Sequence, residues 1–297
     1  LQTPSSGAEV SGNYIGTNAA GDIDPAITAV QGEGVRVSGN TSGNIIGGDV
    51  GNLIAGNRGS GVAVRSLTIT QFGVTATPAK IAVLGNQIYG NEAGGPITGA
   101  LGLGIDLYKA TVASVSFPAD VFTDSAVGLG VNANDSGDPD TGPNGYINFP
   151  VLNSVTQNGA QATVNFNLDA ADSPTSQYRV EFFANDAFDA SGHGEGQTYL
   201  GSATVANGNA QNATITLPGG TDLTGKSISA TTTAIDTTTA SDFGGTSEFS
   251  AGIAATVTTT STGGGQLAAT GANIALITGF ASLLILSAGA TLSKRTR

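Results

Sequence analysis

The chain contains no cysteine, no methionine and no tryptophan, and it is poor in basic residues. Without cysteine there are no disulfides, so stability has to come from apolar burial and backbone hydrogen bonds. Ten Lys and Arg residues against 22 Asp and Glu residues give a net charge of −12. A chain this acidic repels the phosphate backbone, which argues against nucleic acid as a partner.

The longest uncharged apolar run lies near the C-terminus, at residues 272–292. It reaches the length that a helix needs to cross a bilayer core of about 30 Å, so we expect a transmembrane helix there. Basic residues follow it, and a small pentapeptide precedes it. The basic residues are Lys294, Arg295 and Arg297, and the pentapeptide is Leu267, Ala268, Ala269, Thr270 and Gly271.

This order resembles the cell-wall sorting signal of Gram-positive surface proteins. Ala268 occupies the position where most such signals have proline, and the Leu-Ala-x-Thr-Gly form is similar to the variant favoured in actinobacteria. The resemblance implies that a sortase cysteine attacks the bond between Thr270 and Gly271, releases the tail and joins the Thr270 carbonyl to a cell-wall amine. The alternatives are a plain C-terminal membrane anchor and a eukaryotic lipid-anchor signal, in which the apolar tail normally finishes the chain.

The same resemblance implies a location and partners. The protein would be secreted and anchored to peptidoglycan on the extracellular face of a Gram-positive cell. Its partners would be sortase and peptidoglycan, and only the uncleaved tail would contact the membrane. Since a wall-anchored protein must be exported, we expect a signal peptide upstream of Leu1 in the complete gene product.

Short Asn- and Gly-rich phrases recur through the first hundred residues, at residues 12–16, 43–47, 51–57 and 85–91. Each predicts a strand of three or four residues between tight corners, because Gly and Asn tolerate the backbone angles that corners need. A second alternating phrase occurs at Val35/Val37, Val62/Val64 and Ile81/Val83, with separations of 27 and 19 residues. Such a period predicts about four or five coils of a solenoid, with Asn side chains that hydrogen-bond from coil to coil.

Residues 13–21 read Asn-Tyr-Ile-Gly-Thr-Asn-Ala-Ala-Gly, which resembles a phrase of bacterial secreted proteins with right-handed parallel β-helix repeats. Further phrases extend the resemblance over nearly all of the chain before the tail. They lie at residues 102–107, 134–145, 148–152, 195–201 and 246–250. The resemblance implies a short right-handed parallel β-helix and an exported protein, and it implies no particular activity.

From residue 146 the pattern changes to longer strands that alternate apolar and polar residues. Seven such strands predict an immunoglobulin-like β-sandwich. They lie near residues 147–156, 161–168, 177–184, 198–206, 211–217, 226–236 and 246–257. The Thr-, Ser- and Gly-rich stretch after them predicts a flexible tether.

The predicted fold is therefore all-β, with a β-helix, a sandwich, a tether and a C-terminal transmembrane helix. The predicted boundaries are residues 1–110 for the β-helix, 111–145 for a connecting segment, 146–257 for the sandwich, 258–266 for the linker and 267–297 for the sorting signal.

An acidic loop in the connecting segment is a candidate calcium site. Closely spaced Asp135, Asp138 and Asp140 beside glycine offer the oxygen ligands that Ca²⁺ prefers. The closing Glu of an EF-hand is missing, and Asp-Pro, Gly-Pro and Asn-Gly are also ordinary turn signals. A solvated loop between the domains is the alternative.

Enzymes on β-helices often cut acidic polysaccharides with a basic residue or a carboxylate pair. The basic residues of the coils are Arg36, Arg58 and Arg65, and the carboxylates are Asp22, Asp24, Asp49 and Asp106. Solvated turn and cap positions explain these residues as well. The single histidine, His193, lies in a glycine-rich stretch, which predicts an exposed loop.

We expect a structural or adhesive surface protein that holds its domains away from the wall. A polysaccharide or another surface protein would be its ligand. The rivals are a wall-held polysaccharide lyase or glycoside hydrolase that acts along the coil face, and a module that self-associates through the open coil edge.

Overall fold

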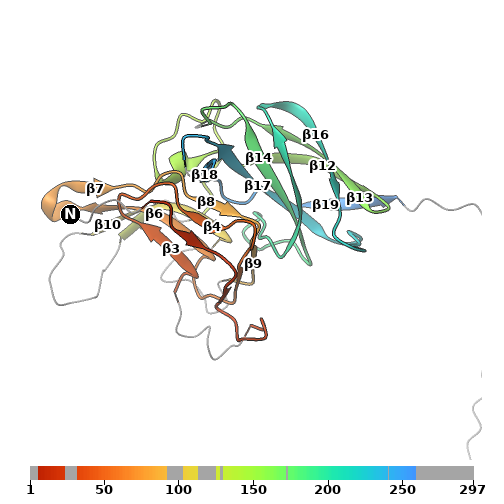
Figure 1. The fold of residues 1–297 in the computed structure, drawn as a ribbon, viewed down its shortest axis with the longest axis horizontal. Helices are drawn as coiled ribbons and strands as arrows, with labels where there is room; N and C mark the ends of the chain where they lie inside the picture. Colours follow the sequence, from red (N-terminus) through yellow and green to blue (C-terminus); the bar gives the residue numbers. More distant parts are fainter. Residues whose placement is uncertain are drawn as a thin grey trace, which may run out of the picture. The chain divides into compact units, whose positions relative to one another are not determined.

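The first strands of the protein visit three short parallel sheets in rotation (Figure 1). The first sheet contains β1 (Glu9–Val10), β4 (Ile45–Gly47) and β8 (Ala82–Leu84). The second contains β2 (Tyr14–Ile15), β5 (Leu53–Ala55) and β9 (Gln87–Tyr89). The third is built on β3 (Val35–Ser38), β6 (Val62–Ile69) and β10 (Ile105–Val112). Each turn of the chain therefore adds one strand to each sheet.

The structure is a computed structural model, and it describes residues 6–23, 32–91, 103–112, 125–127, 130–171, 173–239 and 241–258. Within these ranges the protein is all-β, as predicted, with no α-helix and two short 3-10 turns, η1 (Thr70–Phe72) and η2 (Pro143–Tyr146). Two further strands, β7 (Val74–Ala76) and β11 (Ser125–Val127), pair antiparallel with β6 and β10.

The strand register confirms one predicted coil spacing and corrects the other. Val62 lies opposite Val35, as the separation of 27 residues predicts. Val83, however, pairs with Ile46 in the first sheet, and the next partner of Val62 is Ile105. The error arose because all three sheets turn alternate apolar residues inward, so similar phrases need not belong to the same sheet. The described residues contain three coils rather than four or five.

Small inward side chains fill the interior of the coils. The buried residues there include Ile46, Ile54, Val62, Ile88 and Ile105. Only a narrow core fits between such short strands, and β-branched residues fill it in few rotamers. The predicted inward placement of valine and isoleucine is therefore confirmed.

Asparagine side chains connect successive coils, as predicted. Asn52 Oδ1 accepts the backbone N–H of Asn13 at 3.0 Å, and Asn86 Oδ1 accepts the backbone N–H of Asn52 at 2.9 Å. A second ladder follows β5, where Asn91 Oδ1 accepts the N–H of Asn57 at 3.2 Å. These amides occupy corners where the backbone leaves its sheet, so they satisfy donors that no strand partner reaches.

The second part of the protein contains eight strands linked in one order, β15-β14-β17-β19-β12-β13-β16, with β18 beside β17. Their bounds are β12 (Val151–Asn158), β13 (Gln161–Leu168), β14 (Tyr178–Asn185), β15 (Thr198–Val205), β16 (Gly208–Thr216), β17 (Ser227–Ile235), β18 (Phe243–Thr246) and β19 (Ile253–Thr258). Phe166 on β13 and Phe182 on β14 are four places apart in this order, yet their rings lie 5.8 Å apart. The strands therefore form two facing layers around a shared core.

Six of the seven strands predicted in this part agree with observed strands within a few residues. The run predicted at residues 246–257 is wrong as a single strand, since β18 ends at Thr246 and β19 begins at Ile253. The first four intervening residues, Ser247–Ser250, are buried and leave the ladder to contact β17 and the coils. Ser250 Oγ, for example, accepts the N–H of Ala230 at 3.0 Å.

Side chains from the second part complete the core of the coils. Phe183 and Phe249 belong to the cluster that contains Ile54 and Ile88, and their two rings lie 5.3 Å apart. The backbones of Ile88 and Gly196 also exchange hydrogen bonds of 2.8 and 2.7 Å. The coils and the two-layered part consequently belong to one compact unit.

The predictions for the C-terminal tail concern residues outside the described part. These are most of the linker at 258–266, the pentapeptide from Leu267 to Gly271 and the apolar run at 272–292. Within the described residues, no helix has the length and apolar character needed to span a membrane.

Candidate functional site

Three glutamates of the two-layered part meet the last coil, one at each of its sheets. Just after β8, the N–H of Gly85 donates to Glu181 Oε2 at 2.9 Å. Just after β9, the N–H of Gly90 donates to Glu195 Oε2 at 2.8 Å. In β10, the N–H of Leu107 donates to Glu248 Oε1 at 2.9 Å. The donors that a further coil would have satisfied therefore meet carboxylate oxygens.

The three glutamates form a cap on the last coil, and two uncharged side chains complete it. The N–H of Ile81 donates to Asn144 Oδ1 at 2.9 Å, and the N–H of Val83 donates to Thr246 Oγ1 at 2.8 Å. Asn144 has a positive φ of 49°, which asparagine tolerates better than most residues. Its amide also donates to the carbonyls of Ile81 and Thr246, at 2.8 and 3.0 Å.

Burial shifts the ionisation of the capping carboxyls. It raises the pKa of Glu195 to about 7 and that of Glu248 to about 7, although backbone donors oppose the shift in both cases. Burial also raises the pKa of Glu181, against the effect of Arg179, whose Nη2 lies 2.8 Å from Glu181 Oε1. Removal from water penalises the charged form more than these contacts favour it.

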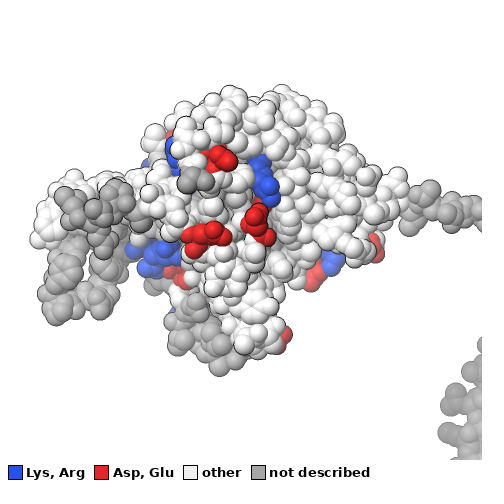
Figure 2. Space-filling view, viewed as in Figure 1, with Lys and Arg blue, Asp and Glu red and all other residues white. Residues whose placement is uncertain are grey.

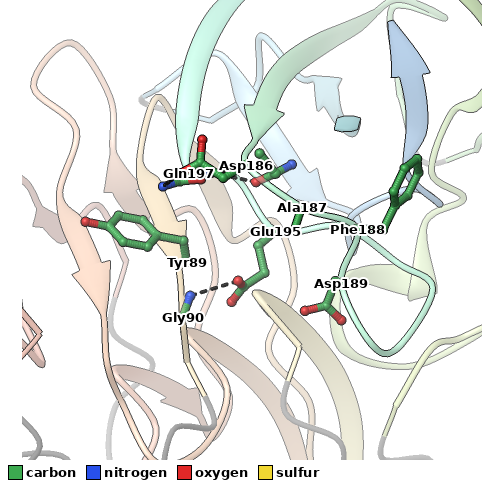
Figure 3. Close-up of a pocket in the computed structure, with 9 residues that line it drawn as sticks. Tyr89, Gly90, Asp186, Ala187, Phe188, Asp189, Glu195 and Gln197 are labelled. Carbon is green, nitrogen blue, oxygen red and sulfur yellow. Dashed lines mark hydrogen bonds between the residues drawn. The ribbon is translucent and has the colours of Figure 1, made fainter. Parts of the chain in front are cut away.

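A surface pocket of about 200 Å³ opens beside Glu195, where the end of β9 meets the loop after β14 (Figure 3). It is lined by Tyr89, Gly90, Asn185, Asp186, Ala187, Phe188, Asp189, Glu195 and Gln197. Figure 3 shows Tyr89 and Phe188 on opposite sides, with the carboxylates of Asp186 and Glu195 between them. The pocket thus combines aromatic surface with clustered oxygen acceptors.

Hydrogen bonds fix the upper wall of the pocket. The amide of Gln197 donates to Asp186 Oδ2 at 3.0 Å, and Gln197 Oε1 accepts the N–H of Asp186 at 2.9 Å. Lys226 Nζ donates to the other oxygen of Asp186. The pKa of Asp186 is lowered by these hydrogen bonds, that from Lys226 first, so this carboxyl is ionised at neutral pH.

The opposite wall has unused hydrogen-bonding capacity. Asp189 Oδ1 accepts the N–H of Ser191 at 2.8 Å, whereas Asp189 Oδ2 has no hydrogen-bond partner among the described residues. The side chain of Phe188 is 60% exposed, and its ring packs over Gly252. This wall therefore offers an aromatic face and a free acceptor to a ligand.

The predicted calcium ligands do not converge as a set. Asp138 is buried and its Oδ2 accepts the N–H of Ala171 at 2.5 Å, whereas Asp140 is exposed. Asp135 Oδ1 is buried without a hydrogen-bond partner among the described residues, which is a feature that fits a cation. No group of three or more His, Cys, Asp or Glu side chains in the described ranges is arranged to hold a metal. Calcium at this loop stays a prediction.

The basic residues proposed for catalysis on the coils occupy different environments. Arg36 on β3 is paired with Glu33, Arg65 on β6 is buried, and Arg58 is exposed in the turn after β5. Strand register places Arg36 and Arg65 on the outward face of the third sheet. Two of the three therefore share a face, as the prediction allowed.

The carboxylates named with these arginines are also dispersed. Asp22 and Asp49 are exposed, and Asp24 lies outside the described residues. Asp106 is fully buried on β10, where Ser60 Oγ donates to its Oδ2 at 3.1 Å.

The exposed position predicted for His193 is wrong. The residue is partly buried, its Nδ1 lies 3.1 Å from the carbonyl oxygen of Phe249, and its ring centroid lies 5.0 Å from that of Phe149 in a T-shaped arrangement. The flanking glycines allow the chain to pack tightly here rather than to extend into solvent. A Cβ at Gly194, for instance, would lie 2.4 Å from Ser229.

The capping glutamates and the pocket were not predicted from the sequence. Glu181 interrupts an otherwise apolar strand, Val180-Glu181-Phe182-Phe183, which is the signal for a buried charge with a specific partner. The pocket gives no such signal, because its residues come from β9 and from a loop about a hundred positions later. The sequence matches no protein-family model, and no curated protein is significantly similar to it.

Proposed function

We propose that the protein is an exported surface protein, covalently anchored to peptidoglycan through Thr270, that presents a rigid β unit in a structural or adhesive role. The observation that carries this proposal is the order Leu-Ala-Ala-Thr-Gly, apolar run, basic end, which follows the folded unit and the Thr-, Ser- and Gly-rich linker after it. The last strand, β19, ends at Thr258. The residues from there to Thr270 would reach at most about 40 Å, enough to hold the unit off its attachment point.

The folded unit supports the finer architecture that we propose, a right-handed parallel β-helix capped by an immunoglobulin-like sandwich. The rotation of strands among three parallel sheets fits a β-helix, and parallel crossovers are right-handed in about 98% of cases. In the second part, β16-β13-β12 correspond to strands E, B and A of an immunoglobulin fold, and β19-β17-β14-β15 correspond to G, F, C and C′.

The surface of the protein supports a binding or structural role more than it supports cleavage of an acidic polysaccharide. Most of the face in Figure 2 is uncharged, and its basic and acidic side chains form only small patches, some of which adjoin each other. Arg65 and Asp106, two residues that could act on a polysaccharide along the coils, are buried. A lyase or hydrolase on the coil face is the weaker alternative, and it would release unsaturated sugars or reducing ends from pectins and glycosaminoglycans.

Cell fractionation tests the anchoring. The complete gene product and its Thr270→Ala variant would be expressed in a Gram-positive host with a matching sortase, with Thr262→Ala in the tether as the control. We expect wild type and T262A in the wall fraction, and T270A retained in the membrane or secreted. An unchanged wall fraction for T270A would overturn the proposal.

A further inference from the structure

The pocket beside Glu195 accepts hydrogen bonds but donates few. Three carboxyl groups line it, and the amide of Gln197 is already used by Asp186. The hydroxyl of Tyr89 is the one lining side-chain donor for which the described residues show no partner. A ligand must therefore supply donors, which hydroxyl and amino groups do, whereas an acidic ligand would meet like charge.

The aromatic side chains restrict the ligand further. Phe188 lines the pocket and leaves 60% of its surface exposed there, so its ring is accessible to a ligand. Tyr89 lines the pocket on the other side from Phe188 (Figure 3). Apolar rings on either side of clustered acceptors suit a molecule that has C–H faces and polar edges, as a pyranose ring has.

We propose that this pocket binds the hydroxyl- or amine-bearing rings of a neutral or amino-sugar glycan, without cleaving them. The assignment rests on the proposed adhesive role and names its ligand class. Phe188 stacks on a ring face, Asp189 Oδ2 accepts from a ring hydroxyl or ammonium group, and Glu195 and Asp186 line the site between the two aromatic rings. Acidic glycans such as oligogalacturonates are disfavoured by the negative charges of Asp186 and Asp189.

Calorimetry on the full chain in mild detergent tests the assignment. The probes are glucosamine oligomers, neutral cello-oligosaccharides and oligogalacturonates, which separate amine, hydroxyl and acid chemistry. We expect measurable binding of at least one of the first two and at least about tenfold weaker binding of the third. Equal or stronger binding of oligogalacturonate, or binding of no probe, would overturn the assignment.

Two pairs of variants locate the site. Phe188→Ala should weaken binding by about tenfold through loss of stacking, whereas Phe72→Ala, equally exposed at 61%, should leave it unchanged. Asp189→Asn should weaken the binding of glucosamine oligomers more than that of cello-oligosaccharides. Asp222→Asn, at an exposed aspartate that does not line the pocket, is its control. Binding that survives both F188A and D189N would place the glycan elsewhere and overturn the proposal.

Glycan binding and wall anchoring are tested by independent experiments. Anchoring is measured by the fate of Thr270 in cells, and glycan binding is measured on purified protein, so either can fail alone. Release of reducing ends during the titration would show turnover and contradict the claim of binding without cleavage.

Discussion

The carboxylate of Glu195 accepts the backbone N–H of Asn91 at 3.3 Å. In the preceding coil, the equivalent donor is the backbone N–H of Asn57, and it donates to the side-chain oxygen of Asn91. Glu195 therefore stands where the asparagine of a further coil would stand. The two-layered part stabilises the coils by satisfying their last donors, and it prevents the open end from pairing with other chains.

This cap makes stability depend on pH. The pKa of Glu195, and likewise that of Glu248, is about 7 in the folded protein against an ordinary value of 4.5. The folded protein thus binds these protons more tightly than the unfolded chain, and the added stability is complete below pH 4.5 and lost as pH rises through 7. We expect the free energy of unfolding to fall by about 2 kcal/mol per carboxyl between pH 5 and pH 8.

Denaturant titrations at several pH values check this expectation. Glu195→Gln and Glu248→Gln should each reduce the slope of stability against pH, even if an amide makes poorer contacts to two donors. Glu9→Gln, at an exposed position of β1, should keep the full slope. A wild-type protein that is equally stable or more stable at pH 8 than at pH 5 would contradict the assignment of the shifts.

The hydrogen bonds between stacked asparagines predict a large loss of stability when one of these amide side chains is removed. Asn52 is buried, accepts from Asn13 and donates to the Val10 carbonyl at 2.7 Å and to Asn86 Oδ1 at 2.9 Å. Asn52→Ala leaves these groups unsatisfied, so we expect a loss of about 3 kcal/mol in unfolding free energy. The exposed Asn153→Ala should cost less than about 1 kcal/mol, and equal costs for the two would rule out a special role for the ladder.

Two glycines at corners of the coils distinguish the cost of an unfavourable backbone angle from the cost of a steric clash. Gly47 has a φ of +92°, and a Cβ there would lie 1.9 Å from the carbonyl oxygen of Leu84 in the next coil. Gly43 also has a positive φ, +68°, but has nothing within 4 Å of a Cβ. Gly47→Ala should therefore cost more than about 3 kcal/mol and Gly43→Ala about 1 kcal/mol, measured by thermal unfolding. Comparable losses would contradict the close approach of the coils.

The acidic loop gives a prediction about calcium. Hydrogen bonds already hold it, since Asn148 Nδ2 donates to the Asp135 carbonyl at 2.8 Å and Asp138 accepts from Ala171. We expect nearly the same melting temperature in excess chelator and in millimolar calcium. A rise of several degrees in calcium that Asp135→Asn abolishes would instead establish a metal site that uses the buried Asp135 Oδ1.

Local patterns predicted the strands well, because alternation fixes which residues face inward. The strand at residues 161–168 was predicted at its observed bounds, and the asparagine contacts between coils follow from the Gly-Asn corners. The assignment of Ile81 and Val83 to the same sheet as Val62 failed. The strands of all three sheets alternate inward apolar residues with outward residues in the same way, so this pattern does not show where one coil ends and the next begins.

The cap and the pocket depend on contacts between distant segments, and short-range patterns hold no information about those. Glu195 meets Gly90 and Asn91 across more than a hundred positions. The partial burial of His193 likewise follows from its packing against Phe149 and its contact with the Phe249 carbonyl, although its neighbouring glycines resemble those of an exposed loop. Long-range packing therefore decided the features that the sequence did not predict.

Mass spectrometry of muramidase-released wall material tests the central claim most directly. Our account predicts a C-terminal peptide that ends at Thr270 and carries a cell-wall amine fragment, with no peptide from residues 271–297. A released protein that still contains the apolar run at 272–292 would contradict covalent anchoring through Thr270.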